Sequence, residues 1–313
     1  MPSDLENIVK EAMETSIDDF VEVIDQAEQL LQREDGAVGL LNILGKHVKI
    51  APLGEAVIIS DLHGDLESLV QILQQSDILK RMRENKNTLL IFLGDYGDRG
   101  EFSAEIYYTV LQLKLQFPEQ VVLMRGNHEG PSDILASPHD LPTQFHSRFG
   151  NKWKTAYNKT IELFPCFYNS ISVEKRYLMV HGGLPGHART ISDFAYAHDT
   201  HPKQTFFEEL LWSDPVEAFQ GVYQSPRGAG RLFGKDITDK VLKALDVRIL
   251  IRGHEPCSNG FQINHEGKIL TLFSRKGEPY YNAQGAYLDM SLSDIYENAK
   301  QLLPYIHKFW ALS

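Results

Sequence analysis

Five short apolar runs, each followed at once by polar residues, constrain the fold of this sequence more than any other feature. Continuous apolar segments that end this abruptly are typical of strands buried on both faces of a sheet. The five runs cover residues 56–59, 89–93, 121–124, 177–180 and 247–251. The chain is therefore expected to contain buried sheet built largely from these strands.

The segments between the first three runs indicate how the strands are connected. Residues 66–83 and 101–117 have helical character, so the order strand, helix, strand, helix, strand predicts a βαβαβ unit with parallel strands. Residues 260–264, 269–273 and 285–290 resemble shorter strands joined by turns, and they predict a second, antiparallel sheet. The expected fold is α/β, a two-sheet β-sandwich flanked by helices.

The first part of the chain has the pattern of consecutive helices. Apolar residues recur at helical spacing over residues 3–33. Ser3 with Glu6, and Ser16 with Asp19, have the spacing of capping boxes. This spacing predicts two helices instead of one long rod.

Length and composition favour a single folded domain behind these helices. The chain has 313 residues, of which 42% are hydrophobic and 23% charged, as in ordinary globular proteins. We expect residues 1–45 to form a helical N-terminal extension that packs on a domain of residues 46–313. A helix that binds a partner is the alternative reading of the extension.

Charge and cysteine usage exclude several classes of protein. The net charge of −11 argues against a protein that binds nucleic acid by neutralising its phosphates. Cys166 and Cys257 are the only cysteines, so neither a disulfide framework nor a cysteine zinc site is indicated. The sequence shows neither the pattern of a secretion signal nor an apolar run long enough for a membrane helix. A cytoplasmic protein without nucleic-acid or membrane partners is expected.

Residues suited to metal binding follow each of the five apolar runs. They are Asp61, His63, Asp95, Asn127, His181 and His254. Ligands of an open α/β sheet collect at the carboxyl ends of its strands, so these residues are expected to converge. A mixture of carboxylate, imidazole and amide ligands suits divalent manganese, iron or zinc. The sequence therefore predicts a metal site at one edge of the fold.

The order and spacing of these residues resemble a known signature. The segments are Asp61-x-His63-Gly64, Gly94-Asp95-x-x-Asp98-Arg99-Gly100 and Arg125-Gly126-Asn127-His128-Glu129. Together they resemble the three-part signature of the PPP family of serine/threonine phosphatases, within the calcineurin-like metallophosphoesterase superfamily. Blocks at residues 210–215, 226–234 and 270–274 are similar to the family's downstream blocks, so the resemblance covers residues 55–290. It implies the calcineurin-like metallophosphoesterase fold for the domain.

The resemblance implies a centre with two divalent metal ions. One ion would be held by Asp61 and His63, the second by Asn127, His181 and His254, and Asp95 would bridge the two. A water shared by the ions would attack phosphorus directly as hydroxide. Manganese is the metal expected in vitro, with iron and zinc as alternatives.

The resemblance also implies roles for four other residues. His128 would be the general acid that protonates the leaving group, and Asp98 would orient its imidazole. Arg99 and Arg227 would bind the phosphoryl oxygens, a task suited to the planar guanidinium group. The substrate would be a phosphoprotein or phosphopeptide, and the sequence leaves regulatory subunits open.

The chain departs from the family pattern at several positions. Ser60 and Gly97 differ from the usual residues but supply no ligand. Residues 274–282 form a shorter loop than in eukaryotic members, and Tyr280 or Tyr281 is a candidate for the tyrosine that those members carry there. This loop and the helical amino terminus predict a prokaryotic member. Two other functions stay open, a small-molecule phosphoesterase such as a dinucleoside polyphosphate hydrolase and a non-catalytic scaffold.

Overall fold

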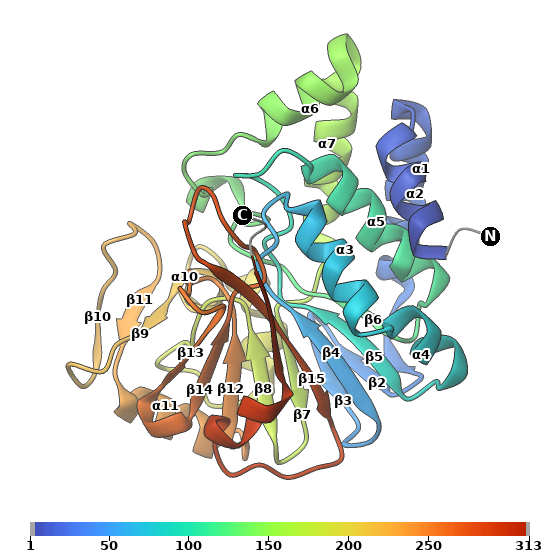
Figure 1. Cartoon of the computed structure of the whole chain (residues 1–313). Coiled ribbons are helices and arrows are strands. Elements are labelled where there is room, and N and C mark those ends of the chain that lie inside the picture. The colour runs from blue at the N-terminus through green and yellow to red at the C-terminus, as the bar shows by residue number, and fades with distance from the viewer. Residues whose placement is uncertain (1–3, 311–313) are drawn as a thin grey trace.

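Two large β-sheets form a sandwich, with helices gathered around it (Figure 1). The structure, a computed structural model, describes residues 4–310. A single cluster of buried apolar side chains includes residues of both sheets, for example Ile58 and Leu270. The predicted two-sheet α/β sandwich is confirmed.

The expected βαβαβ unit forms most of a five-stranded sheet. Strands β4 (Glu55–Ile59), β5 (Thr88–Phe92) and β6 (Val121–Leu123) lie parallel, as predicted. Strand β15 (Gln284–Ser291) pairs antiparallel with β4, and β16 (Ile306–Trp310) pairs with β15. The carboxyl ends of β4, β5 and β6 consequently share one edge of the sheet.

The second sheet has eight strands and is mixed. In spatial order it contains β1 (Gly36–Val38), β2 (Leu41–Leu44), β3 (His47–Ile50), β7 (Ser170–Val173), β8 (Tyr177–Val180), β12 (Ile249–Arg252), β14 (Ile269–Leu272) and β13 (Phe261–Asn264). The predicted antiparallel pairing holds for β13 with β14. The sheet as a whole is not antiparallel, because β3 with β7, β8 with β12, and β12 with β14 are parallel pairs. Parallel neighbours need long crossover connections, and the chain between β8 and β12 is long enough to carry several helices.

The strand predicted at residues 285–290 lies in the five-stranded sheet and not, as expected, beside residues 260–264 and 269–273. After β14 the chain crosses between the sheets. The backbone N–H of Ala286 still donates to Phe273, but two residues later Leu288 pairs with Ile58 of β4. Strands that are consecutive in sequence need not be neighbours when the connecting loop is long enough to change sheets.

A small third sheet lies beside the sandwich. It contains β9 (Asp214–Pro215), β10 (Val222–Gln224) and β11 (Arg231–Phe233), with β11 in the centre. All three residues of β10 are exposed, so no apolar pattern marks this strand in the sequence.

The helices cover the sandwich and connect its strands. They are α1 (Asp4–Glu14), α2 (Ile17–Arg33), α3 (Leu66–Gln75), α4 (Ile78–Glu84), α5 (Ser103–Gln116), α6 (Leu141–Phe149), α7 (Trp153–Leu163), α8 (Ile191–Ala195), α9 (Ala197–Thr200), α10 (Phe206–Trp212) and α11 (Lys235–Ala244). The helical stretch expected at residues 66–83 is two helices, because Asp77 adopts a left-handed conformation with φ of 49° and ends the first one. None of the helices in the described part of the chain combines the length and apolar character needed to cross a membrane.

The two predicted N-terminal helices are present and are joined at Ser16. The hydroxyl of Ser16 accepts a hydrogen bond from the backbone N–H of Asp19 at 3.2 Å, so Ser16 caps α2 as expected. The other predicted cap, Ser3, lies outside the described residues.

Aromatic packing and one arginine hold these helices on the domain. Phe20 is fully buried and contacts the Phe145 ring edge-to-face, with the centroids 5.7 Å apart. Arg148 donates hydrogen bonds to backbone carbonyls of Met13 and Thr15, both at 3.0 Å, at the end of α1. The helical part ends at Arg33. Residues 36–44, which are part of the predicted extension, form two strands of the eight-stranded sheet.

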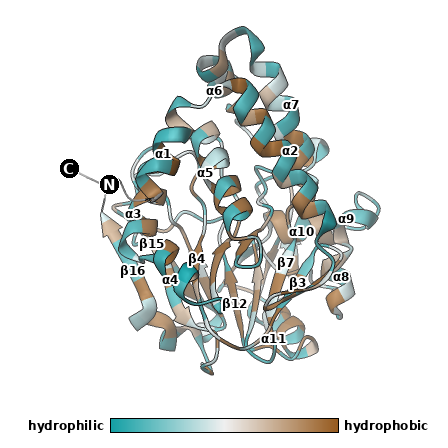
Figure 2. Ribbon diagram, turned by 90° about the vertical axis from the view of Figure 1, so that its right-hand side faces the viewer, coloured by the Kyte–Doolittle hydropathy of each residue, from teal (hydrophilic) through white to brown (hydrophobic). Residues whose placement is uncertain are grey.

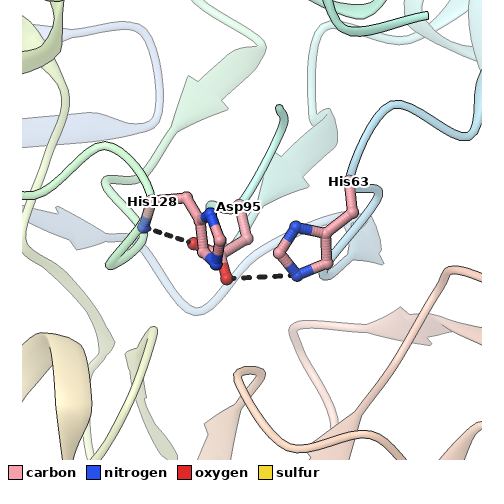
Figure 3. A group of neighbouring side chains, drawn as sticks. All are labelled: His63, Asp95 and His128. Carbon is pink, nitrogen blue, oxygen red and sulfur yellow. Dashed lines mark hydrogen bonds and ion pairs between the residues drawn. The ribbon is translucent and has the colours of Figure 1, made fainter. Parts of the chain in front are cut away.

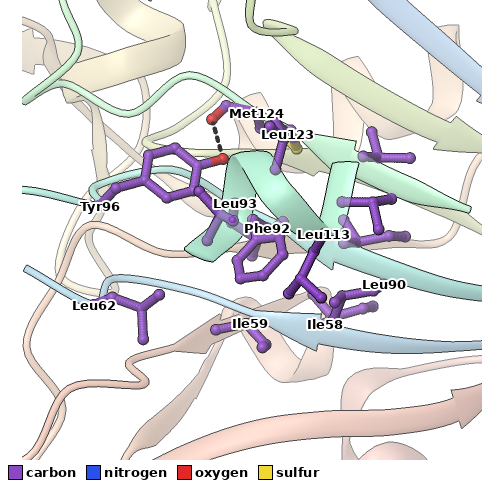
Figure 4. Close-up of a cluster of buried hydrophobic side chains, with 14 of the residues drawn as sticks. Ile58, Ile59, Leu62, Leu90, Phe92, Leu93, Tyr96, Leu113, Leu123 and Met124 are labelled. Atoms are coloured by element: carbon purple, nitrogen blue, oxygen red, sulfur yellow. Dashed lines mark hydrogen bonds between the residues drawn. The ribbon is translucent and has the colours of Figure 1, made fainter. Parts of the chain in front are cut away.

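The apolar core explains why the strands end where they do. Figure 4 shows side chains of β4, β5 and β6 packed with Leu113 of α5, and Tyr96 closes this cluster with a hydrogen bond to the Met124 carbonyl at 2.9 Å. Figure 2 shows apolar residues along the strands inside the molecule and hydrophilic residues on the outer faces of the helices. The polar residues that follow each strand therefore emerge together at the rim of this core.

Candidate metal centre

Loops with unusual backbone conformations present the site residues. His63, Asp95, Asp98, Arg99 and His254 all have positive φ, between 45° and 74°. Such conformations cost of order 1–3 kcal/mol each in non-glycine residues, and they persist at functional sites where the surrounding structure imposes them. Here the loops are anchored at the ends of buried strands, and this anchoring holds the residues in these conformations.

Glycines allow these loops to approach one another closely. Gly94, with φ of 104°, lies against the loop after β6, and a Cβ atom there would come within 2.3 Å of the Gly126 nitrogen. A side chain at this position would separate the loop that carries Asp95 from the loop that carries Asn127.

One group of potential ligands surrounds the first side of Asp95. Its Oδ2 lies 3.4 Å from Nε2 of His63, and its Oδ1 accepts the backbone N–H of His128 at 3.0 Å (Figure 3). Oδ1 of Asp61 lies 3.8 Å from the same His63 nitrogen. Ligand atoms of His63, Asp95 and His128 lie within 4.8 Å of one another. The structure thus brings the predicted Asp61, His63 and Asp95 together and adds the ring of His128.

A second group lies on the other side of Asp95. Nε2 of His181 is 3.3 Å from Oδ2 of Asp95. Oδ1 of Asn127 lies 2.9 Å from Nε2 of His181 and 2.8 Å from Nδ1 of His254. Because both groups include Asp95, its carboxylate is placed between two potential metal sites.

The donor set fits divalent cations. The Asn127 oxygen, which faces two ring nitrogens, can share a cation with them when they are unprotonated. Nε2 of His254 is buried and has no hydrogen-bond partner among the described residues. Carboxylate, imidazole and amide donors together suit manganese, iron or zinc. The residues present can therefore hold the two ions.

Burial shifts the pKa values of these ligands. Burial lowers the pKa of His63 to about 3 and the pKa of His254 well below its usual value, so both rings are neutral and able to bind a metal. Burial raises the pKa of Asp61. For His181 burial opposes the charge, but the Asp95 carboxylate outweighs it and raises the pKa to about 9. A cation between these groups would stabilise the carboxylates and displace the proton of His181.

His128 and Asp98 form a buried hydrogen-bonded pair. Nδ1 of His128 lies 2.7 Å from Oδ2 of Asp98. Burial opposes ionisation of Asp98, yet its hydrogen bonds to His128 and other donors hold its pKa below the usual range. Although burial disfavours the imidazolium, the neighbouring Asp95 and Asp98 raise the pKa of His128. The Nε2 atom of His128 remains available at the site.

The two predicted arginines line the same cavity, of about 310 Å³. Arg99 donates to the carbonyls of Pro138 at 2.5 Å and Ser137 at 3.2 Å. Nε of Arg227 donates to Oδ2 of Asp214 at 2.6 Å. Arg227, from the loop after β10, therefore reaches the cavity that the strand ends define.

All ten predicted site residues gather at this place. Seven of them line the cavity, namely His63, Asp95, Arg99, Asn127, His128, Arg227 and His254. Asp61, Asp98 and His181 are at most 1% exposed and lie beneath its surface. The cavity also distinguishes the two candidate tyrosines, because Tyr280 lines it whereas Tyr281 is 78% exposed.

Sequence reasoning assigned no role to two buried residues whose hydrogen bonds hold the site loops in place. The Glu129 carboxylate accepts the backbone N–H groups of Asp95 at 2.9 Å and Tyr96 at 3.0 Å, which fixes the loop after β5. Arg252 is fully buried and donates to Asp214 at 3.1 Å. Glu129 ends the third signature segment and Arg252 lies two residues before His254, and this closeness to predicted site residues was the available signal for both.

The fold is that of a metallophosphoesterase, and the predicted ligands gather at one place in it. Residues 56–258 match the family described as calcineurin-like phosphoesterase, and the chain belongs to that family.

Related proteins and structures agree with this assignment. A probable serine/threonine-protein phosphatase of Encephalitozoon cuniculi is 31% identical over 279 residues, which cover 88% of this chain and 56% of the relative. Serine/threonine-protein phosphatase T of Saccharomyces cerevisiae is 31% identical over 268 residues, covering 84% of this chain and 48% of the relative. The chain thus spans about half the length of these two curated relatives.

A solved structure shares nearly the whole fold. It is a serine/threonine phosphatase from Saccharomyces cerevisiae with similarity to human phosphatase PP5, with a TM-score of 0.76 and 25% identity, covering 95% of this chain and 90% of that one. The predicted resemblance to PPP phosphatases is confirmed. These relatives are eukaryotic, and a prokaryotic origin stays a prediction.

Proposed function

We propose that this chain is a metal-dependent phosphomonoester hydrolase that acts as a serine/threonine protein phosphatase. The observation that carries the proposal is the position of Asp95, which lies between two groups of metal ligands beside the His128–Asp98 pair and at the floor of a cavity lined by two arginines. Each part of this arrangement has a use in phosphoryl transfer to water.

The ligands divide between two ions that share Asp95. In this assignment the first ion takes Asp61 and His63, and the second takes Asn127, His181 and His254. When bound, two such ions supply positive charge for the phosphoryl oxygens and lower the pKa of an attacking water. Manganese is the proposed metal in vitro, with iron or zinc as alternatives.

His128 is the proposed general acid. Because its Nδ1–H is held by Asp98, the proton on Nε2 points to the cavity and can pass to the departing alkoxide. The pKa of His128 is raised above its ordinary value, which favours the protonated ring that an acid needs. Serine and threonine alkoxides are poor leaving groups, so this proton matters for their release.

Arg99 and Arg227 are the proposed phosphate-binding residues. Only Nε of Arg227 donates to a carboxylate, and its two Nη groups have no hydrogen-bond partner among the described residues. Both Nη groups of Arg99 donate to loop carbonyls, so binding phosphate would require Arg99 to exchange at least one of these bonds. A phosphomonoester dianion is the ligand that two such guanidinium groups favour.

A metal-addition assay tests the proposal. The metal-depleted protein is supplied with Mn²⁺, Fe²⁺ or Zn²⁺ singly, and phosphoserine, phosphothreonine and phosphotyrosine peptides are compared with diadenosine tetraphosphate. We expect the phosphoserine and phosphothreonine peptides to be hydrolysed fastest, with Mn²⁺ effective. Faster turnover of the dinucleotide would favour a small-molecule phosphoesterase, and no turnover with any ion would favour a non-catalytic scaffold.

A further inference from the structure

We propose that His139 is a positioning residue that acts on the general acid His128 through the carboxylate they share, Asp98. This inference rests on the proposed function, since it assigns a second histidine to the proton-donating side of the same site. His139 lies in the loop between β6 and α6, eleven residues beyond His128 in the sequence. No part of the sequence signature includes it.

Asp98 is held by four hydrogen bonds. Its Oδ2 accepts from Nδ1 of His128 at 2.7 Å and from Nδ1 of His139 at 3.0 Å. Its Oδ1 accepts the backbone N–H groups of Asp140 at 3.0 Å and Leu141 at 2.7 Å. Since the Asp98 side chain is only 1% exposed, water contributes little to its solvation. The carboxylate therefore depends on these four donors for its charge and its orientation.

Asp98 and Tyr157 together define the tautomer of His139. The Tyr157 hydroxyl, on α7, lies 2.9 Å from Nε2 of His139. An ionised carboxylate only accepts, so Asp98 requires the proton of His139 on Nδ1. In the neutral ring Nε2 is then the acceptor, and the Tyr157 hydroxyl donates to it. Hydrogen bonds therefore connect Tyr157 to His139, His139 to Asp98, and Asp98 to His128.

These hydrogen bonds affect how His128 is oriented for proton transfer. Without the His139 donor, Oδ2 of Asp98 would keep His128 as its one partner. The carboxylate would then be less constrained, and a small tilt that lengthens the Oδ1 hydrogen bonds would shift Oδ2. The imidazole of His128 would follow, because Asp98 is the acceptor that orients it. A misplaced Nε2–H slows proton transfer to the leaving group without weakening substrate binding.

Other contacts fix the loop itself, so the effect of His139 can be isolated. The Asp140 carboxylate accepts the backbone N–H of Arg99 at 3.0 Å. Asp133, which lies in the same loop before His139, is bound from outside the loop, because its Oδ2 lies 2.9 Å from Nε2 of His201. Replacement of His139 should leave these anchors intact, and His201→Ala is a matched control that removes a loop anchor without touching Asp98.

The kinetic experiment compares His139→Ala, His139→Asn and His201→Ala on a phosphoserine peptide and on p-nitrophenyl phosphate, whose leaving group needs no proton. For His139→Ala we expect a loss of about tenfold in kcat on the peptide, an unchanged KM, and less than about threefold loss on p-nitrophenyl phosphate. His139→Asn should recover most of the loss, because its amide N–H can occupy the place of Nδ1–H. Equal losses on both substrates, no recovery with asparagine, or the same pattern in His201→Ala would overturn the proposal.

A spectroscopic readout separates this inference from the proposed function. In the zinc-loaded protein, which is diamagnetic, the Nδ1 proton of His128 should give a hydrogen-bonded NMR resonance that moves in His139→Ala and stays in place in His201→Ala. An unmoved resonance in His139→Ala would refute the coupling even in an active enzyme. If the wild-type protein hydrolyses no phosphoserine peptide, the proposed function fails, and the resonance still decides whether His139 acts on His128.

Discussion

Nε of Arg227 lies 2.6 Å from Oδ2 of Asp214, in an ion pair that joins the loop after β10 to β9. Oδ1 of the same carboxylate accepts a hydrogen bond from the fully buried Arg252 at 3.1 Å. Arg252 ends β12, two residues before the predicted ligand His254. The orientation of Arg227 is thus tied to the strand that precedes the predicted ligand His254.

Arg227→Ala should lower kcat/KM for a phosphopeptide by roughly ten- to a few hundred-fold, or about 1.5–3 kcal/mol, because it removes a charge-assisted contact to the phosphoryl group. Arg227→Lys should restore part of this, since an ammonium returns the charge without the planar fork. Inorganic phosphate should inhibit the alanine variant less strongly. Unchanged kcat/KM and unchanged phosphate inhibition in Arg227→Ala would place this side chain outside the substrate site.

Asp95→Asn should abolish activity and weaken both metal sites, because a neutral amide cannot bridge two cations as a carboxylate does. Elemental analysis after reconstitution with manganese should give two ions per chain for the wild-type protein and fewer for the variant. A wild-type stoichiometry of one ion would contradict the dinuclear centre. The exposed Asp199, far along the chain from the ligands, offers a control as Asp199→Asn, which should keep both ions.

His128→Asn should slow hydrolysis of alkyl phosphates far more than that of p-nitrophenyl phosphate, because only the alkyl leaving group needs a proton. The metal content should stay unchanged, since the His128 ring belongs to the Asp98 pair in our assignment. Loss of metal from this variant would instead favour His128 as a ligand, a reading that its position beside His63 and Asp95 makes worth testing.

His47 should make the stability of the protein depend on pH. Its ring is buried between the hydroxyls of Ser170 and Ser172, each 2.8 Å away, and burial lowers its pKa from 6.5 to about 4. The unfolded chain binds this proton more readily than the folded one, so the stability present above pH 6.5 is lost as the pH falls toward 4. The loss attributable to His47 is on the order of 3 kcal/mol.

Denaturant unfolding between pH 4 and pH 7.5 checks this expectation. Burial also lowers the pKa of His63, His254 and His265, so the quantity to compare is the difference between variants. His47→Asn should flatten the dependence of the unfolding free energy on pH, whereas His146→Asn, at an exposed position of α6, should leave it unchanged. Parallel curves for the wild-type protein and His47→Asn would show that the buried ring does not carry this effect.

Local patterns in the sequence were enough to predict the strands of the parallel unit and the candidate ligands that follow them. Both are local patterns, because a buried strand needs an unbroken apolar run and a metal ligand needs a polar residue where that run ends. The apolar segment at residues 89–93 followed by Asp95 therefore identified both the strand and the proposed bridging residue. The two N-terminal helices were predictable for the same reason, since Ser16 and the apolar spacing after it are local.

Only the tertiary structure decided which segments meet. The crossing of the chain from β14 to β15 placed residues 285–290 in the other sheet, and no local pattern records such a crossing. His139 reaches Asp98 across 41 residues, and Arg252 reaches Asp214 across 38. These contacts arise because a buried charge must find partners wherever the packed chain brings them. The sequence shows which residues are able to act as partners. The packing of the two sheets determines which of them come into contact.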